Sequence, residues 1–488
     1  MTANGTAASR NPRVIDARAA IGTQGTTPAR GTALRAGIAT VCLSGSLEEK
    51  LEAAADAGFD GVELFENDLI GSPLSPAEIR VRAGDLGLSI DLYQPFRDFE
   101  AVPTAQLERN LHRAEAKFDV MDELGATMML VCSNVSPDAI DDDELAAEQL
   151  RRLAEAADAH GIRIAYEALA WGSRVNEYDH AWRIIELADH PALGTCLDSF
   201  HILSRGTPLD TIEHIPPEKL FFVQLADAPH LVMDVLQWSR HYRCFPGQGG
   251  FDLADFTARV VRAGYTGPLS LEVFNDVFRQ ADPQRMAVDA MRSLLILEES
   301  LEARETPRLL PAPPALDGYA FIEFAVEPAS VGDMQRLLHG MGFSQAAQHR
   351  TKPVALWEQD DVRVLLNAAA SPTAGIAAIG LESADPDRSA TRAETLLAPV
   401  LDRDRAPGEA DLAAVAAPDG TSVFFCGPDA GWVADFAPER PAPDGPLRRI
   451  DHLALAQPFD AFDEAALFYR AVLAQEPDGG EEDRKSVV

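Results

Sequence analysis

Residues 163–167 read Arg163-Ile164-Ala165-Tyr166-Glu167, and residues 194–198 read Gly194-Thr195-Cys196-Leu197-Asp198. Both are short, mostly apolar runs that end on a carboxylate, and longer stretches of helical periodicity flank them. Two later runs, Phe222-Val223-Gln224 and Leu269-Ser270-Leu271-Glu272, also end on a polar side chain. Buried strands that alternate with helices are typical of a parallel sheet. This repeat therefore decides the fold prediction.

Eight such strands are predicted between residues 35 and 304. They lie at 36–43, 61–65, 88–93, 128–132, 163–167, 194–198, 220–225 and 269–272. Helices are predicted between them, for example at 47–57, 107–124, 144–160 and 253–263, and Gly58, Gly161 and Gly264 mark helix ends. Eight βα units over this length predict a closed (β/α)8 TIM barrel, class α/β. An open doubly wound sheet is the alternative, but no GxGxxG motif follows the first strand.

A different pattern follows the barrel region. Residues 307–316 contain four prolines, so we place a linker at 305–316 and a second domain at 317–488. That domain is predicted to contain strands at 319–326, 354–357, 362–366, 376–381, 411–416 and 422–426, with helices at 331–341 and 390–397. The order indicates partial α+β βαβββ units, and a third round begins at 449–454 without being completed. Residues 1–34 and 479–488 are predicted to be disordered.

The charge balance restricts the partners. The chain carries 42 Lys and Arg against 77 Asp and Glu, a formal net charge of −35. Such a surface repels nucleic acid and anionic lipid, so neither is expected as a partner. The sequence contains no apolar segment typical of a secretory signal or a membrane span, and we predict a cytoplasmic location. Five cysteines without CxxC spacing are expected to be reduced.

Glu167, Asp198, Gln224 and Glu272 end four consecutive predicted strands. In a TIM barrel these strand ends converge on the catalytic face. Three carboxylates crowded there repel one another unless a cation lies between them, so we predict a divalent metal site. Oxygen ligands suit Mg²⁺ or Mn²⁺, and Co²⁺ also fits. The alternative is that these side chains only cap strand ends or pair with basic residues.

His201 and a set of arginines are further candidate site residues. His201 lies three residues after Asp198, where an imidazole could act as a proton acceptor, although it could also be a capping or surface histidine. Arg97 follows the third strand, and residues 238–243 form a cationic loop in an acidic chain. Guanidinium groups bind carboxylates through paired hydrogen bonds, which predicts a small anionic substrate. Surface salt bridges are the alternative for each arginine.

Asp227 and His230 follow the strand that ends near Gln224. Side chains at such positions can orient metal ligands through hydrogen bonds. We therefore expect Asp227 and His230 to support the metal site.

The barrel region resembles the xylose-isomerase-like superfamily of sugar phosphate isomerases and epimerases. Within that superfamily it more closely resembles bacterial 3-dehydroshikimate dehydratases that carry an extension similar to 4-hydroxyphenylpyruvate dioxygenase. The likeness lies in residues 61–65, 197–201, 223–229, 245–249 and 270–272. It implies that Glu167, Asp198, Gln224 and Glu272 are the metal ligands, that His201 is the base, and that Ser239 and Arg243 contact the substrate. Glutamine at position 224, where many relatives have histidine, narrows the resemblance to the two-domain group.

The second half resembles the dioxygenase at residues 318–325 and at Ile450-Asp451-His452-Leu453-Ala454. Iron in that family is held by two histidines and a glutamate, and His452 matches only the first of them. The resemblance therefore implies a truncated, non-catalytic module that is similar to vicinal oxygen chelate proteins.

The resemblance implies dehydration of 3-dehydroshikimate to protocatechuate in shikimate and quinate catabolism. A sugar or sugar-phosphate isomerase or epimerase on the same barrel is the alternative enzyme. A barrel kept only as a binding module is the alternative outside catalysis. The expected partner is the small anionic substrate, and a homo-oligomer stays open.

Overall fold

The structure is a computed structural model that describes residues 34–302, 310–368, 375–403, 405–439 and 445–476. Contacts between Cα atoms divide these residues into two compact units, 34–302 and 310–476. The predicted tail at 1–33, the linker residues 305–309 and the charged segment 479–488 lie outside the described residues.

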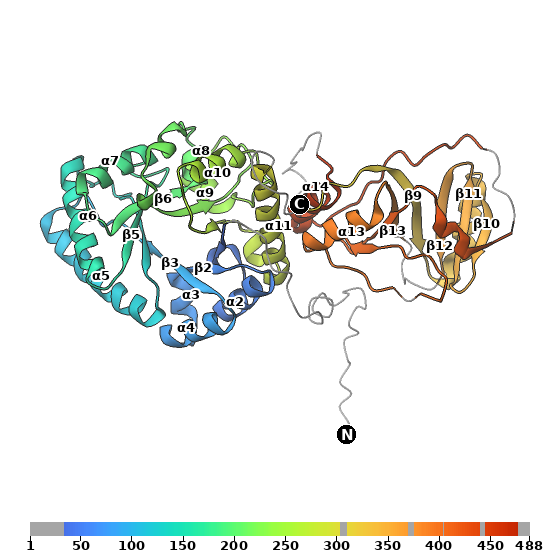
Figure 1. The fold of residues 1–488 in the computed structure, drawn as a ribbon, viewed down its shortest axis with the longest axis horizontal. Helices are drawn as coiled ribbons and strands as arrows, with labels where there is room; N and C mark the ends of the chain where they lie inside the picture. The colour runs from blue at the N-terminus through green and yellow to red at the C-terminus, as the bar shows by residue number, and fades with distance from the viewer. Residues whose placement is uncertain (1–33, 303–309, 369–374, 404, 440–444, 477–488) are drawn as a thin grey trace, which may run out of the picture. The chain divides into compact units, whose positions relative to one another are not determined.

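The first unit is a closed barrel of eight parallel strands, surrounded by helices (Figure 1). The strand β1 pairs with β2 on one side and with β8 on the other, which closes the ring. This confirms the predicted (β/α)8 barrel and rules out the open sheet. The strands are β1 (Ala36–Ala39), β2 (Gly61–Phe65), β3 (Ser89–Phe96), β4 (Met128–Cys132), β5 (Arg163–Glu167), β6 (Leu193–Asp198), β7 (Leu220–Leu225) and β8 (Leu269–Leu271).

The helices around the barrel begin and end at the local signals that the sequence carries. The Ser46 hydroxyl accepts a hydrogen bond from the Glu49 backbone and the Glu49 carboxylate accepts one from the Ser46 backbone, which starts α2. Gly125, with φ of +72°, ends α5. No helix within the described residues is long and apolar enough to span a bilayer. The helices are α2 (Leu47–Asp56), α3 (Glu66–Gly71), α4 (Pro76–Asp85), α5 (Thr104–Leu124), α6 (Asp143–Asp158), α7 (Tyr178–Ala188), α8 (Ser199–Leu203), α9 (Val235–His241), α10 (Leu253–Arg262) and α11 (Pro283–Glu302).

Burial on both faces explains why the barrel strands are nearly continuous apolar runs. Every residue of β4, β6 and β7 is buried, because one face packs in the barrel interior and the other packs against the helices. A polar side chain on such a strand can be accommodated only where partners surround it. The polar residues at the carboxyl ends of these strands therefore form a defined site.

The second unit is built on one mixed sheet of eight strands in the order β14-β15-β13-β9-β12-β11-β10-β16. The run β9-α12-β10-β11-β12 is a βαβββ unit, the class that was predicted, although only three of its four strands had been placed in the sequence. The strands are β9 (Leu316–Ala325), β10 (Ser344–His349), β11 (Val354–Gln359), β12 (Val362–Asn367), β13 (Gly375–Ser383), β14 (Ala414–Ala416), β15 (Ser422–Cys426) and β16 (Phe436–Pro438). The helices are α12 (Val331–Gly340), α13 (Pro386–Thr395) and α14 (Phe462–Leu473).

Three elements of this unit were not predicted, and one predicted strand is absent. The strand β10 contains no β-branched residue and exists because it pairs with β11 and β16. The strand β16 is only three residues long, and α14 was not recognised. Residues 449–454 form no strand, and Ile450 instead packs against a buried cluster that includes Val326, Leu338 and Phe343.

A chain that ends at residue 309 is expected to fold into the barrel by itself, because β1 and β8 close the ring without any later residue. Far-ultraviolet circular dichroism should show helix and strand signals, and heating should give one cooperative transition. A broad transition with loss of near-ultraviolet signal would contradict an independent barrel.

Candidate active site

Four side chains lie at or near the carboxyl ends of consecutive barrel strands. Glu167 ends β5, Asp198 ends β6, Gln224 lies near the end of β7, and Glu272 directly follows β8. Their exposed fractions are 2%, 2%, 0% and 4%, respectively. The parallel ladder pairs Asp198 with Gln224, so the two residues lie side by side.

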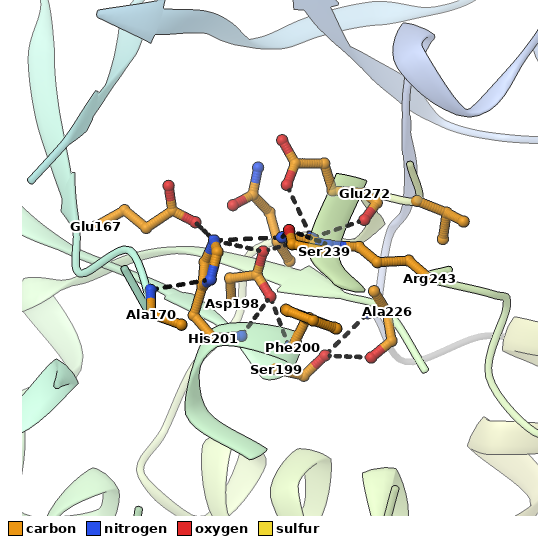
Figure 2. A network of polar contacts seen from close by, with 12 residues as sticks. Glu167, Ala170, Asp198, Ser199, Phe200, His201, Ala226, Ser239, Arg243 and Glu272 are labelled. Carbon is orange, nitrogen blue, oxygen red and sulfur yellow. Dashed lines mark hydrogen bonds and ion pairs between the residues drawn. The ribbon is translucent and has the colours of Figure 1, made fainter. Parts of the chain in front are cut away.

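The two carboxylate oxygens of Asp198 have different hydrogen-bond partners. Oδ1 accepts hydrogen bonds from the backbone N–H groups of Phe200 at 2.6 Å and His201 at 3.3 Å, which caps α8 (Figure 2). Oδ2 lies 2.7 Å from Nη1 of Arg243. The cap therefore holds the carboxylate in one orientation, with Oδ2 directed into the site.

Arg243 lies buried among the acidic side chains (Figure 2). Its Nη1 donates to Asp198 Oδ2, to Glu272 Oε2 at 3.1 Å and to the Glu272 carbonyl at 3.0 Å. The Ser239 hydroxyl accepts from Nε at 3.2 Å and from Nη2 at 2.9 Å. Burial alone would raise the pKa of Asp198, but the Arg243 charge holds that pKa below its usual value. Arg243 is thus the positive charge that offsets these carboxylates.

The Glu167 carboxylate has fewer hydrogen-bond donors around it than the Asp198 carboxylate. Its Oε2 accepts a hydrogen bond from the Cys132 thiol at 3.3 Å, but its buried Oε1 has no hydrogen-bond partner. Burial, together with the negative charges of Asp198 and Glu272, raises the pKa of Glu167 well above its usual value. Burial also raises the pKa of Glu272. The site therefore holds more negative charge than Arg243 alone can neutralise.

His201 lies against the acidic group (Figure 2). Its Nε2 is 3.5 Å from Glu167 Oε1 and 3.7 Å from Asp198 Oδ2. These three residues offer ligand atoms within 4.8 Å of one another, so they could hold a metal ion together. Burial lowers the pKa of His201 to about 3, so the ring is neutral near pH 7.

Two donors compete for the lone pair of the neutral His201 ring. The backbone N–H of Ala170 donates to Nδ1 at 3.2 Å, and Nη2 of Arg243 lies 3.2 Å from Nε2. A neutral imidazole has one acceptor nitrogen, so it can accept from only one of them at a time. The Arg243 contact stabilises the tautomer whose lone pair is on Nε2.

Gln224 belongs to a separate hydrogen-bonded group inside the barrel. Its Nε2 donates to Glu63 Oε2 at 2.6 Å, and the Cys196 thiol donates to its Oε1 at 3.2 Å. Sequence reasoning did not select Glu63. The signal was present, because a glutamate within the apolar strand Gly61–Phe65 is unusual unless it has partners.

A pocket opens beside the acidic group. Its lining includes Glu167, His201, Ser239, Arg243 and Glu272, together with Arg97, Arg240, Trp171, Gln94 and Phe274. All five cysteines of the chain are free and buried, and Cys132 also lines this pocket. The structure therefore places the predicted Arg97, His201, Ser239 and Arg243 around one cavity.

Arg97 and Arg240 both face this pocket without an ion pair to any carboxylate in the described part of the chain. The Arg240 guanidinium lies 4.9 Å from the ring centre of Phe274 and 5.8 Å from that of Trp171. Burial and the positive charge of Arg97 lower the pKa of Arg240. Sequence reasoning noted the cationic loop but did not single out Arg240.

Asp227 and His230 have other partners than the expected metal ligands. Asp227 accepts hydrogen bonds from four backbone N–H groups, those of Ala228, Gly247, Gly249 and Phe251. It therefore fixes the loop after β7. Nε2 of His230, an exposed side chain, lies 2.9 Å from the carbonyl oxygen of Gly250.

Family models match both units. Residues 51–296 match the family described as xylose isomerase-like TIM barrel. Residues 311–381 match the N-terminal region of hydroxyphenylpyruvate dioxygenase. The two matches agree with the two compact units of the structure.

Individual relatives match most of the chain. The 3-dehydroshikimate dehydratase of Pseudomonas putida (strain KT2440) is 47% identical over 462 residues, which cover 89% of this chain and 72% of that protein. The enzyme of the same name from Pseudomonas aeruginosa (strain PAO1) is 47% identical over 459 residues, with the same coverage of 89% and 72%. A solved structure named a xylose isomerase-like TIM barrel/4-hydroxyphenylpyruvate dioxygenase fusion protein is 45% identical, with a TM-score of 0.84, and the match covers 90% of this chain and 74% of that one. The chain therefore belongs to the two-domain 3-dehydroshikimate dehydratase family, in which a xylose-isomerase-like barrel precedes a hydroxyphenylpyruvate dioxygenase-like region.

Proposed function

We propose that the barrel removes water from 3-dehydroshikimate to give protocatechuate, with the help of a divalent cation, in the breakdown of shikimate and quinate. Membership in the family makes the chain an enzyme of the hydro-lyase class. The observation that carries the proposal is one pocket lined both by the carboxylates Glu167 and Glu272 and by two arginines, Arg97 and Arg240, that form no ion pair among the described residues. A substrate with both a ketone and a carboxylate suits such a pocket, because a cation held by the carboxylates can meet the ketone and the arginines can meet the substrate carboxylate.

Glu167, Asp198, Gln224 and Glu272 are the residues that would hold the cation. Three of them are buried carboxylates; Asp198 and Glu272 share the Arg243 guanidinium, and Glu167 Oε1 has no hydrogen-bond partner. These features fit a site for a positive ion with oxygen ligands such as Mg²⁺, Mn²⁺ or Co²⁺. A bound cation supplies polarisation of the substrate ketone and stabilises the charge that develops on its oxygen.

His201 is the proposed proton acceptor. The proton to be removed lies on the carbon next to the ketone, and Nε2 is the ring nitrogen that faces the acidic group. Because burial keeps the ring neutral, Nε2 can accept that proton when its lone pair is free. The protonated ring can then return a proton to the departing hydroxyl, which leaves as water. Transfer of a second ring proton to the former ketone oxygen then completes the aromatic product.

Arg97 and Arg240 are proposed to bind the substrate carboxylate. Arg243, which the family resemblance implied as a substrate contact, already donates to Asp198, Glu272 and Ser239. Arg97 and Arg240 have no such carboxylate partners within the described residues, and their like charges repel each other. An anion between them relieves this repulsion and fixes the substrate orientation.

The second unit is proposed to be non-catalytic. His452, the one residue that resembles a dioxygenase iron ligand, is exposed and contacts its neighbour Asp451 at 3.1 Å. Among the described residues, the group that could hold a metal ion is the one in the barrel, made by Glu167, Asp198 and His201.

The purified full chain is expected to convert 3-dehydroshikimate to protocatechuate when Mg²⁺, Mn²⁺ or Co²⁺ is added, and EDTA should abolish the conversion. Product formation can be followed by its ultraviolet absorbance and by chromatography. Full activity after complete metal removal would contradict the metal-dependent mechanism. Much faster turnover of a sugar or sugar phosphate in a parallel substrate panel would favour an isomerase or epimerase instead.

The variants Glu272→Ala and His201→Ala are expected to fail in different ways. Loss of a carboxylate ligand weakens metal binding, so excess metal should restore part of the Glu272→Ala rate. Loss of the proton acceptor should lower turnover by about 10² to 10⁴ at every metal concentration. Because His201 lies within ligand distance of Glu167 and Asp198, its alternative role is that of a ligand. Recovery of His201→Ala to nearly wild-type rate with excess metal would assign it that role.

Replacing Arg97 or Arg240 with leucine is expected to raise KM for 3-dehydroshikimate by about 10- to 100-fold, because each variant removes charge-assisted hydrogen bonds to the carboxylate. Steady-state kinetics at saturating metal measure this change. Arg262→Leu is the matched control, since Arg262, on α10, forms an exposed ion pair with Glu213. An unchanged KM in both pocket variants would show that other groups bind the carboxylate.

A further inference from the structure

Glu63 is a carboxylate in the barrel interior that the proposed mechanism does not use. It lies in the middle of β2, and its exposed fraction is 0%. No described Lys or Arg forms an ion pair with it. A buried carboxylate without a cation is costly unless hydrogen-bond donors surround it. The partners of Glu63 therefore indicate why it is there.

Three donors converge on the Glu63 carboxylate from three other strands. Its Oε2 accepts from Nε2 of Gln94 at 2.8 Å and from Nε2 of Gln224 at 2.6 Å. Its Oε1 accepts from the hydroxyl of Ser270. Oε2 accepts from two amide groups at once, so both glutamines must turn their NH₂ ends, and not their carbonyl oxygens, toward it.

This arrangement decides which end of the Gln224 amide faces away from Glu63. The NH₂ and carbonyl ends of an amide have nearly the same shape but opposite hydrogen-bonding character. If the amide were reversed, two oxygens would face each other at the 2.6 Å contact and repel. In the observed orientation, Oε1 meets only the weakly donating thiol of Cys196, at 3.2 Å. Only the oxygen end can bind a hard cation.

We propose that Glu63 is a positioning residue that locks the Gln224 amide so that its carbonyl oxygen, and not its NH₂ group, is presented to the metal. The inference rests on the proposed function, because it assumes that Gln224 is a ligand. Glu63 itself touches neither substrate nor metal in this role. It acts through the direction of one hydrogen bond.

The chain offers three substitutions that separate this positioning role from the effect of charge alone. Glu63→Gln loses the charge but can keep all three contacts: its Oε1 can accept from both glutamines while its NH₂ donates to the Ser270 hydroxyl, which can also accept. Glu63→Leu is equally neutral and similar in size but offers no acceptor. Glu63→Asp keeps the charge but withdraws the carboxylate by about 1.5 Å, one carbon–carbon bond.

Binding of Mn²⁺ to the full metal-free chain is the measurement, by titration calorimetry or by the electron paramagnetic resonance signal of free Mn²⁺. Glu63→Gln is expected to bind within about threefold of wild type. Glu63→Leu and Glu63→Asp are expected to bind about 10- to 100-fold more weakly, the usual effect of losing a partner that orients a ligand. Circular dichroism and thermal unfolding without metal report whether each variant is folded.

Several outcomes would overturn the inference. If charge alone mattered, Glu63→Gln and Glu63→Leu would weaken binding equally and Glu63→Asp would bind like wild type. If Glu63 only stabilised the barrel, the variants would melt earlier but bind Mn²⁺ normally once folded. If Glu63→Asp does not fold, the comparison between the two neutral variants still decides. Absence of Mn²⁺ binding by wild type would instead overturn the proposed function.

Discussion

Repulsion among buried carboxylates is the constraint on which the rest of this site depends. Glu167, Asp198 and Glu272 come from three strands, and the closed barrel brings them to one end of its interior. Burial removes the water that would otherwise screen their charges. Arg243 offsets two of them directly, and the pKa of Glu167 stays well above its usual value. The site thus lacks positive charge, which the proposed divalent cation would supply.

The surrounding side chains keep the uncompensated negative charge of these carboxylates at the site. The cap on α8 engages one oxygen of Asp198 and leaves the other for the site. The positive groups Arg97 and Arg240 line the same pocket as Glu167 and Glu272. Because they face the cavity and not the carboxylates, their charges stay available to a ligand. The two arginines would meet the anionic end of a small molecule, and a cation held by the carboxylates would meet its carbonyl oxygen.

Periodicity and composition predicted the barrel well, because its strands are buried on both faces and must be continuously apolar. Six of the eight strands, β2, β4, β5, β6, β7 and β8, were predicted within one residue at each end for this reason. The metal-ligand candidates were recognisable because they interrupt the apolar pattern at strand ends. The strands β10 and β16 were missed because partners elsewhere in the sheet create them, and sequence propensity does not report distant partners.

Side-chain direction was harder to predict than position. Arg240 and Arg243 lie three residues apart in one cationic loop, yet Arg243 turns to Asp198 and Glu272 whereas Arg240 lies over Phe274 and faces the pocket. The spacing alone does not distinguish these two roles, because the ion pairs depend on strands far away in the sequence. The same holds for Gln224, since the orientation of its amide group depends on a hydrogen bond to Glu63, which is 161 residues away in the sequence. A neutral amide ligand adds no negative charge to a group that already contains three carboxylates. It does, however, need a fixed acceptor behind it to present oxygen, and the buried carboxylate of β2 would be that acceptor if Gln224 is a ligand, as proposed.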